Sequence, residues 1–504
     1  MMQSDPALAE VTALLRAGNL TGAMRVAARL RRAYPTSALA HQVSADIALR
    51  RFDWEIAERF YREAISLDDG LWQARNNLAN VCRYTDRRTE SAQLLRDAIH
   101  CCPDRQQAAR LHSNLLIHMH SDTGVDQTKI FSELREWRAL HLPTLSVSPV
   151  RAARSNDGRP LIALVSGAFG SQIFSRLLPH VLREVSQSRF RIELVNTGAA
   201  APVPSFYEGA SLSWLNCADV PTLRARDYSI AVDLDGHSPT GSLPLFAMRI
   251  APVQVSWLDC FNSTGVPAMD FFFGDSISTP ASLRETFSEQ IVLLPQFRLC
   301  FDPPEFATRQ ILTAQPGTSS ITYGVFGRFD KHNAALYSHW IEILKRSPNA
   351  TLLFKATAFD GAELRQHVRR RFHEHGIASD RIRFAGTTDY RAHLELHEQV
   401  TLMLDTFPYN GGVSSFDSML CGVPIVTCLG DHPASRQTAA ILQACGLNEY
   451  VANSPADYVQ CALALAAQPR PSRDDIRHRF LASELIDSHR FAKGLVDAFE
   501  QILQ

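Results

Sequence analysis

The chain has 504 residues, of which 51 are Lys or Arg and 52 are Asp or Glu, so its formal net charge is -1. A chain of this length is too long to fold around a single hydrophobic core, so we expect two to four domains. The balanced charge does not indicate binding to nucleic acid or to a membrane surface, and no apolar run reaches the roughly 18 residues of a membrane span.

The N-terminal residues and the cysteines indicate the cellular compartment in which the protein folds. The start, MMQSDPALAE, has neither a basic flank nor an apolar core, so it does not read as a secretory signal. Ten cysteines are scattered along the chain and none form a CxxC pair. We expect free, buried thiols in a reducing compartment rather than disulfides or a zinc site, and therefore a cytoplasmic protein.

Residues 1–141 predict an array of helical hairpins with a period near 34 residues. Equivalent helix starts recur at positions 4, 38, 72 and 106, and turn residues recur at Pro35, Asp69 and Pro103. This period is typical of tetratricopeptide repeats, in which neighbouring repeats bury each other's faces. Such an array either offers a surface to a protein partner or only caps the next domain. Residues 142–159, rich in Pro, Ser, Arg and Gly, predict a linker.

From residue 160 the pattern changes to short apolar runs between helical stretches. The first expected strands cover 161–166, 192–196, 230–234, 253–257, 271–274 and 291–294, and a break with several prolines follows at 302–318. The next cover 321–326, 352–355, 382–384, 400–404 and 425–428. Continuous apolar strands that alternate with helices indicate parallel sheets covered on both faces.

We therefore expect two Rossmann-like domains, 160–302 and 319–504, with a ligand cleft at the carboxyl ends of their strands. The last helix, 490–503, either closes its own domain or crosses back to the first one.

In the first of these domains the segment 231–237, AVDLDGH, ends a strand with two acids, Asp233 and Asp235. Their spacing resembles a DxD metal-binding signature. Two Rossmann-like halves do not need that metal where a lysine and helix N-termini can neutralise an anionic leaving group. We expect Asp235 to form a strand-end turn, His237 to face the cleft, and no metal to be bound.

In the second domain, Arg328 and Lys331 follow the strand 321–326. Two cations at a strand end could neutralise a diphosphate, and solvated surface charge is the alternative. His393 lies on an expected helix, 390–398, where its flat ring could stack on a base or simply face solvent.

The stretch 402–436 reads as strand, glycine loop, helix and strand. Gly411 and Gly412 let the backbone approach a ligand, and the helix from about 414 to 420 directs N–H groups and its positive dipole end at the loop, which suits a phosphate. Ser414 and Ser415 could cap this helix or bind the same anion. Asp417, one turn in, could accept from ribose hydroxyls. The alternative is that the glycines and serines only form the turn between the strand and the helix, with no ligand bound.

Taken together, these segments resemble the protein O-GlcNAc transferase family in its bacterial branch, which joins tetratricopeptide repeats to a GT-B glycosyltransferase. The resemblance covers nearly the whole chain. It is most specific in FSELREWRALH (131–141), DLDGHS (233–238), APVQVSWL with TGVPAMDF (251–258 and 264–271), VFGRFDK (325–331), and DTFPYNGGVSSFDSMLCGVPIVT with PASR (405–427 and 433–436).

The resemblance implies a glycosyltransferase that moves a sugar, GlcNAc from UDP-GlcNAc, onto Ser or Thr hydroxyls of a protein bound by the repeats, such as a flagellin or an adhesin. It implies inversion without metal or cofactor, so that the acceptor oxygen attacks C1 while the enzyme stabilises the departing UDP. By position, Lys331 matches the lysine that holds the diphosphate, His393 the histidine that stacks on uracil, and Asp417 the acid that binds ribose. The rest of the expected donor site is Arg328, Asn410, Gly411, Gly412, Val413, Ser414 and Ser415.

The acceptor side departs from the family pattern. Gln172 and Arg176 stand where the family has histidines, and the loop that usually reads Gly-Tyr-Pro-Gly is here residues 259–262, DCFN. We expect Asp235 and His237 to supply polar groups near the acceptor. The competing hypotheses are a scaffold that has lost catalysis, a transferase that uses another sugar nucleotide, and a transferase that acts on a glycan or lipid.

Overall fold

The computed structural model describes residues 5–142, 158–309, 321–467 and 472–504. The chain divides into two compact units. The first contains residues up to 118 together with 328–341 and 353–387, and the second contains 119–327, 342–352 and 388–504. Most of the predicted linker at 142–159 and much of the predicted break at 302–318 lie outside the described residues.

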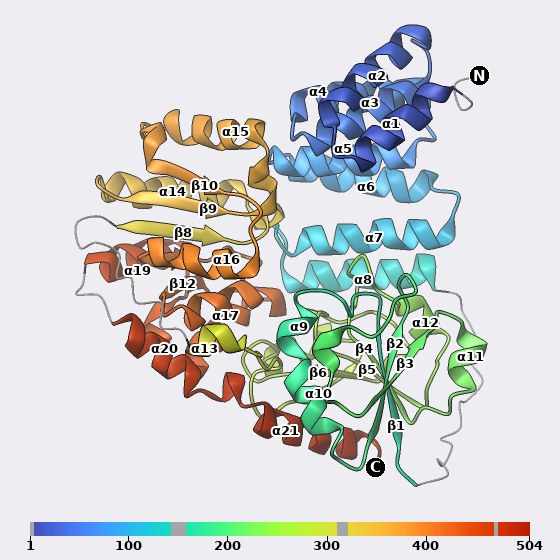
Figure 1. Cartoon of the computed structure of the whole chain (residues 1–504), viewed down its shortest axis with the longest axis vertical. Helices are drawn as coiled ribbons and strands as arrows, with labels where there is room; N and C mark the ends of the chain where they lie inside the picture. Colours follow the sequence, from blue (N-terminus) through green and yellow to red (C-terminus); the bar gives the residue numbers. More distant parts are fainter. Residues whose placement is uncertain (1–4, 143–157, 310–320, 468–471) are drawn as a thin grey trace. The chain divides into compact units, whose positions relative to one another are not determined.

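The first unit is built on paired antiparallel helices (Figure 1). The first helix of each pair begins at position 6, 38 or 72, and α7 begins at 105, which confirms the period near 34 residues. Small residues at equivalent positions of the second helices, Ala23, Ala57 and Ser91, are buried where the helices approach. The helices are α1 (Pro6–Arg16), α2 (Leu20–Ala33), α3 (Ala38–Arg50), α4 (Trp54–Leu67), α5 (Trp72–Tyr84), α6 (Arg88–Cys101) and α7 (Arg105–Met119).

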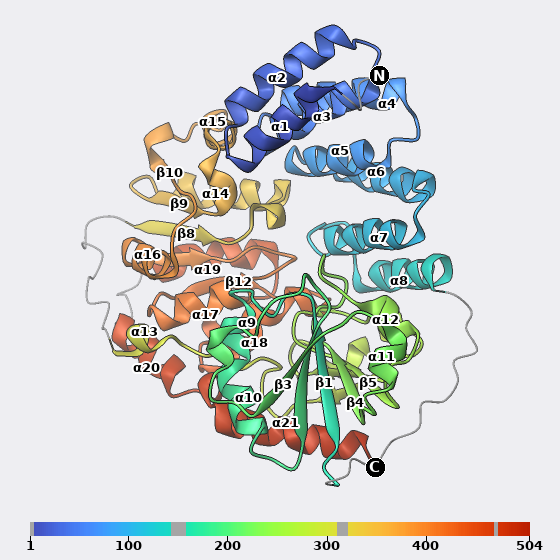
Figure 2. The same cartoon turned by 45° about the vertical axis from the view of Figure 1, so that its right-hand side comes forward.

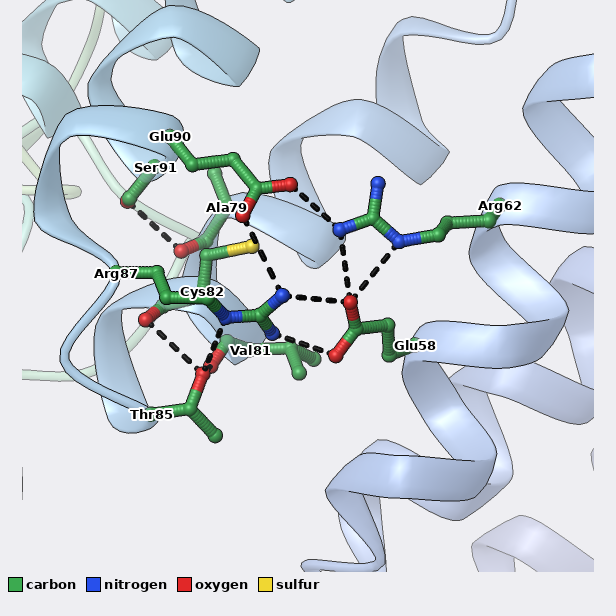
Figure 3. A network of polar contacts seen from close by, with 9 residues as sticks. All are labelled: Glu58, Arg62, Ala79, Val81, Cys82, Thr85, Arg87, Glu90 and Ser91. Carbon is green, nitrogen blue, oxygen red and sulfur yellow. Dashed lines mark hydrogen bonds and ion pairs between the residues drawn. The ribbon is translucent and has the colours of Figure 1, made fainter.

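A polar network joins the second and third repeats (Figure 3). The Glu58 carboxylate on α4 accepts from Arg87 at 2.5 Å and from Arg62 at 2.7 Å. Arg62 also donates to Glu90 on α6 at 2.5 Å. Single exposed ion pairs contribute only about 0.2–1 kcal/mol, but several charges that share partners also fix geometry. The network thus helps to hold consecutive repeats at one angle.

The second unit holds a seven-stranded sheet of order β3-β2-β1-β4-β5-β6-β7. Its registered pairs are all parallel. The strands are β1 (Leu161–Ser166), β2 (Arg191–Asn196), β3 (Leu212–Asn216), β4 (Ile230–Asp233), β5 (Val253–Ser256), β6 (Phe271–Gly274) and β7 (Gln290–Leu293). The sequence did not predict β3, an edge strand that is only partly buried.

Helices lie on both sides of this sheet, with α10 (Pro179–Val185) and α11 (Val220–Arg224) on opposite sides (Figure 2). The last helix, α21 (Ser488–Ile502), packs against α10. Phe499 on α21 contacts the rings of Phe190 and Phe273, both with centroids 5.7 Å away. Of the two predicted courses of the last helix, the crossing back to the first α/β domain is therefore confirmed.

The other sheet has six strands in the order β10-β9-β8-β11-β12-β13. They are β8 (Thr322–Phe326), β9 (Thr351–Lys355), β10 (Ile382–Ala385), β11 (Leu402–Leu404), β12 (Ile425–Cys428) and the two-residue β13 (Val451–Ala452), which the sequence did not predict. Both sheets follow the doubly wound order in which the first strand of the series lies at the centre. A helical array with two Rossmann-like sheets is the predicted fold class, which the structure confirms.

Helix α8 (Gln127–His141) packs on the first sheet's half of the second unit. A side chain at Gly265 would lie 3.1 Å from the Leu134 carbonyl, so glycine permits this close approach. All ten cysteines are free thiols, and the predicted burial holds for six of them, while the other four are half-buried. Within the described ranges, no helix combines the length and the apolar character that crossing a bilayer requires.

Candidate active site

In doubly wound sheets, ligands bind beyond the carboxyl ends of the strands, at the point where the strand order reverses. That point lies between β1 and β4 in one sheet and between β8 and β11 in the other. Gln172 and Arg176 follow β1, and Asp235 and His237 follow β4. Arg328 and Lys331 follow β8, and the glycine loop follows β11. The site residues predicted from sequence thus fall where this topology expects a ligand.

The glycine loop is organised by Asp405, at the end of β11. Its Oδ1 accepts from the Gly411 N–H at 2.8 Å, and its Oδ2 accepts from the Thr427 hydroxyl at 2.7 Å. Asn410 donates its side-chain amide to the Thr406 carbonyl at 2.9 Å, so it supports the loop from within. A Cβ at Gly411 would collide with the Ser415 hydroxyl, so any larger residue would displace that hydroxyl from its place in the loop.

Helix α17 (Val413–Leu420) begins directly after this loop. Gly412 is its N-cap and provides no side-chain cap, so the N–H groups of the first turn face the loop. Ser415 does not cap the helix, because its hydroxyl is buried against that of Thr438 at 2.8 Å. Val413 and Ser414 are half-buried. The loop and first turn can therefore receive an anion through backbone groups, with Ser414 the closer candidate for a hydroxyl contact.

One turn into α17, Asp417 is buried and engaged by α16 (Tyr390–Leu396). The Tyr390 hydroxyl donates to its Oδ1 at 2.6 Å, and Nε2 of His393 lies 3.3 Å from Oδ2. Burial and the neighbouring carboxylate raise the pKa of the Tyr390 phenol, so it stays protonated and donates. Arg176, expected on the acceptor side, has its guanidinium carbon 3.1 Å from the centre of the Tyr390 ring.

His393 is held between Asp417 and the end of β8. Its side chain is only 12% exposed, unlike a solvated surface histidine, and its ring centre lies 5.9 Å from that of Phe326. The described residues leave its buried Nδ1 without a hydrogen-bond partner. Next to it, burial and the charge of His393 lower the pKa of His397 to about 3. Flat rings around a buried acid are the groups that a base and a ribose require.

On the other sheet, Asp235 is buried and stabilises the turn after β1. It accepts from the Ser166 hydroxyl and from the Gly167 N–H, both at 2.8 Å. Burial raises its pKa to about 6, and burial together with Asp235 raises the pKa of Asp233 to about 8. His237 lies in the loop after β4, with its Nε2 2.9 Å from the Thr264 carbonyl oxygen. Gln172, by contrast, is exposed.

A pair of buried histidines, His120 and His432, forms a histidine cluster beside the glycine loop. His120, after α7, has its ring centre 5.2 Å from that of His432 and 6.1 Å from that of Tyr409 in the glycine loop. Burial, then the charges of His432 and His237, hold the pKa of His120 well below its usual range. The cluster places two neutral imidazoles beside the glycine loop, one from the end of α7 and one from the loop that follows β12.

Arg328 and Lys331 belong to the first unit. The short turn Phe329–Lys331 carries Asp330, whose Oδ1 is 3.3 Å from Nε of the exposed Arg328. Burial favours the neutral acid, but Arg83, Arg328 and Lys331 outweigh it and lower the pKa of Asp330 to about 2. The two cations therefore stand beside an ionised carboxylate.

Sequence reasoning missed Asp405, Tyr390, His120 and His432. Tyr390 was within reach, because it precedes His393 by three residues and so shares a helix face with it. Asp405 lies inside the segment that carries the resemblance, but only the fold brings its carboxylate to Gly411. His120 and His432 are far apart in sequence, and no local pattern pairs them.

Comparison with known proteins gives one family. The profile described as glycosyl transferase family 41 matches residues 211–305 and 306–495. In barley, a protein named probable UDP-N-acetylglucosamine–peptide N-acetylglucosaminyltransferase SPINDLY is 31% identical over 288 residues, which cover 56% of this chain and 30% of that protein. A UDP-N-acetylglucosamine–peptide N-acetylglucosaminyltransferase of Caenorhabditis elegans is 21% identical over 453 residues, 65% of this chain and 39% of that protein.

Among solved structures, a mutant of the Thermobaculum terrenum O-GlcNAc transferase aligns with a TM-score of 0.83. It is 24% identical in sequence, and the alignment covers 99% of this chain and 96% of that one. This similarity supports the same fold over the whole length. The chain spans about a third of the length of the curated relatives it matches, at 30% and 39%.

Proposed function

The chain belongs to glycosyl transferase family 41, and we propose that it transfers a sugar from a nucleotide donor to Ser or Thr hydroxyls of a protein. The observation that carries the proposal is the buried Asp417, held by Tyr390 and His393 one turn behind a glycine loop. A carboxylate fixed in this way can accept from the two hydroxyls of a ribose, while the first turn of α17 receives the phosphates.

We assign the nucleoside to the rings of Tyr390 and His393 beside Asp417, and the diphosphate to the glycine loop. His393 stacks on the base, and its buried Nδ1 is available for a polar group of the nucleoside. Backbone groups of Gly411, Gly412 and Val413 face the phosphates. Lys331, with Arg328, neutralises the charge that develops on the departing diphosphate, a contribution of about 3–4 kcal/mol for one well-placed group.

The reaction proceeds by direct attack of the acceptor oxygen on C1 of the sugar, with inversion and without a metal. Its rate then depends on orientation and on electrostatic stabilisation of the leaving group. On the acceptor side, His237 and the histidine cluster supply polar groups. Asp235 ties the loop after β4, which carries His237, to the turn after β1.

UDP-GlcNAc is the proposed donor, because the names of the barley and nematode relatives specify it for those proteins. The acceptor is a protein that the helical repeats bind. A flagellin or an adhesin is our candidate acceptor, and this choice rests on the sequence resemblance alone.

The test is thermal stabilisation of the full chain by UDP, GDP and CMP and by their sugar conjugates. A ligand that binds only the native state raises stability by about 2.7 kcal/mol at a hundred times its Kd. We expect the largest shift with UDP-GlcNAc, and loss of that shift in Asp417→Ala. If only GDP and its sugar conjugates stabilise the chain, the donor is a GDP-sugar and the protein is still a glycosyltransferase. No stabilisation by any nucleotide would favour a scaffold that works through its repeats.

A further inference from the structure

The turn that carries Lys331 is held by the helical repeats. Arg83, at the end of α5, is 7% exposed. Its guanidinium donates to the Asp330 carbonyl at 2.5 Å and pairs with the Asp330 carboxylate at 3.1 Å. One repeat side chain thus fixes both the backbone and the side chain of the residue before Lys331.

A second arginine of the repeats holds the other side of the same turn. Arg88, the first residue of α6, donates to the His332 carbonyl at 2.5 Å. The carbonyls on both sides of Lys331 therefore accept from neighbouring helices of one repeat. The backbone on either side of Lys331 is therefore held by Arg83 and Arg88.

Aromatic packing completes the contact. Phe329 packs against two rings of the repeats, with its ring centre 5.8 Å from that of Trp54 and 5.6 Å from that of Tyr84. His332 is buried against Phe329 on the other side of Lys331, with ring centres 4.9 Å apart. The turn is thus fixed by two arginines and by aromatic packing on both sides of Lys331.

We propose that Arg83 and Arg88 are positioning residues that orient Lys331 for transfer, so that the repeats form part of the catalytic apparatus as well as an acceptor surface. The inference rests on the proposed function, which assigns the leaving group to Lys331. Displacing a catalytic group by about 1 Å can cost about a hundredfold in rate, so a side chain that touches no substrate can still set turnover.

The test compares Arg83→Met and Arg88→Met with a matched control, Arg87→Met, in the full chain. Arg87 lies between them in sequence but pairs with Glu58 in the network between repeats (Figure 3). We expect kcat to fall about 10- to 100-fold in the first two variants with nucleotide Kd within about threefold of the parent. In Arg87→Met, kcat and the nucleotide Kd should both stay near the parent values. If kcat falls equally in Arg87→Met, the loss in the other two variants comes from a less stable repeat array, and the inference is overturned.

A double variant shows whether the effect passes through Lys331. If Arg83 acts by orienting Lys331, then Arg83→Met should change kcat by less than about threefold in a Lys331→Ala background. Full additivity would overturn the inference. Arg83→Lys, which keeps the charge but not the forked donor, should recover part of kcat and guards against a misfolded Met variant.

Amide hydrogen exchange over residues 328–332 tests whether Arg83 holds this turn, and it does not depend on an activity assay. We expect exchange to speed up at least about tenfold in Arg83→Met and to stay unchanged in Arg87→Met. Unchanged exchange in Arg83→Met would overturn the inference. If Lys331→Ala keeps full kcat, Lys331 has no role in transfer, and the part of the proposed function on which this inference rests fails. A normal kcat in Arg83→Met beside an inactive Lys331→Ala would overturn the inference alone and leave the proposed function intact. Absence of transfer and of nucleotide binding in the parent chain would overturn the proposed function itself.

Discussion

Replacing Tyr390 with Phe removes one hydroxyl from the Asp417 cluster and leaves the ring in place. That hydroxyl donates to the buried Asp417 carboxylate at 2.6 Å. In the variant, Asp417 would keep its second partner, His393, at 3.3 Å. Hydrogen bonds to charged groups contribute about 1.5–3 kcal/mol. We expect Tyr390→Phe to lower the free energy of unfolding by about 2 kcal/mol.

The same change should weaken nucleotide binding. Without the phenol, Asp417 loses the partner that fixes Oδ1, and its carboxylate must be oriented by the ligand itself. We expect the Kd for UDP to rise about tenfold, which corresponds to about 1.4 kcal/mol. Urea denaturation measures the first effect, and isothermal titration calorimetry with UDP measures the second.

Tyr323→Phe is the matched control. The Tyr323 hydroxyl on β8 pairs with the neutral hydroxyl of Ser347 at 3.2 Å. Its loss should cost about 0.5–1.5 kcal/mol of stability and leave the Kd unchanged. The reasoning is refuted if Tyr390→Phe binds UDP as tightly as the parent chain, because Asp417 would then not depend on its partner or would not contact the ribose.

Further predictions concern the leaving group, the loop and pH. Lys331→Ala should lower kcat by about two to three orders of magnitude with the unfolding midpoint unchanged, measured by transfer kinetics and calorimetry, and an unchanged kcat would remove Lys331 from catalysis. Gly411→Ala should abolish nucleotide stabilisation in the thermal assay, since its Cβ would collide with the Ser415 hydroxyl; retained stabilisation would show that the loop does not contact the phosphates. Burial holds the pKa of His332 and of His397 at about 3 in the folded chain. The unfolded chain protonates them below about pH 6.5, so stability falls as pH falls, by up to about 1.4 kcal/mol for each at about pH 5.5. His397→Asn should reduce this loss in denaturant titrations at about pH 7.5 and 5.5, and an equal loss in the variant would contradict the assignment.

Sequence periodicity predicted the elements that are long or strongly apolar. The repeat starts and the central strands agree with the structure to within one or two residues, because small residues and continuous apolar runs repeat at fixed spacing. The strands β3 and β13 were missed for a physical reason: one is a partly exposed edge strand and the other has two residues. Neither carries a continuous buried run that a local pattern can report.

The site was predictable where its residues are close in sequence. The glycine loop, Asp417 and His393 come from one segment and a neighbouring helix. The partners that fix them do not, because Arg176 reaches Tyr390 from the other sheet and His120 reaches Tyr409 from the end of α7. Arg83 and Arg88 are likewise about 245 residues from the carbonyls they hold, at separations of 247 and 244. Such contacts exist only after folding.

The most direct test of the central claim is transfer of radiolabelled GlcNAc from UDP-GlcNAc to protein. The full chain and Lys331→Ala would each be incubated with the labelled donor and a heat-treated extract of host proteins, and label that remains with protein would be counted before and after alkaline β-elimination. The account predicts base-labile label, as expected for sugar on Ser or Thr, with the parent chain and almost none with Lys331→Ala. Absence of protein-bound label with the parent chain, for UDP-GlcNAc and for the other sugar nucleotides that stabilise it, would contradict the account.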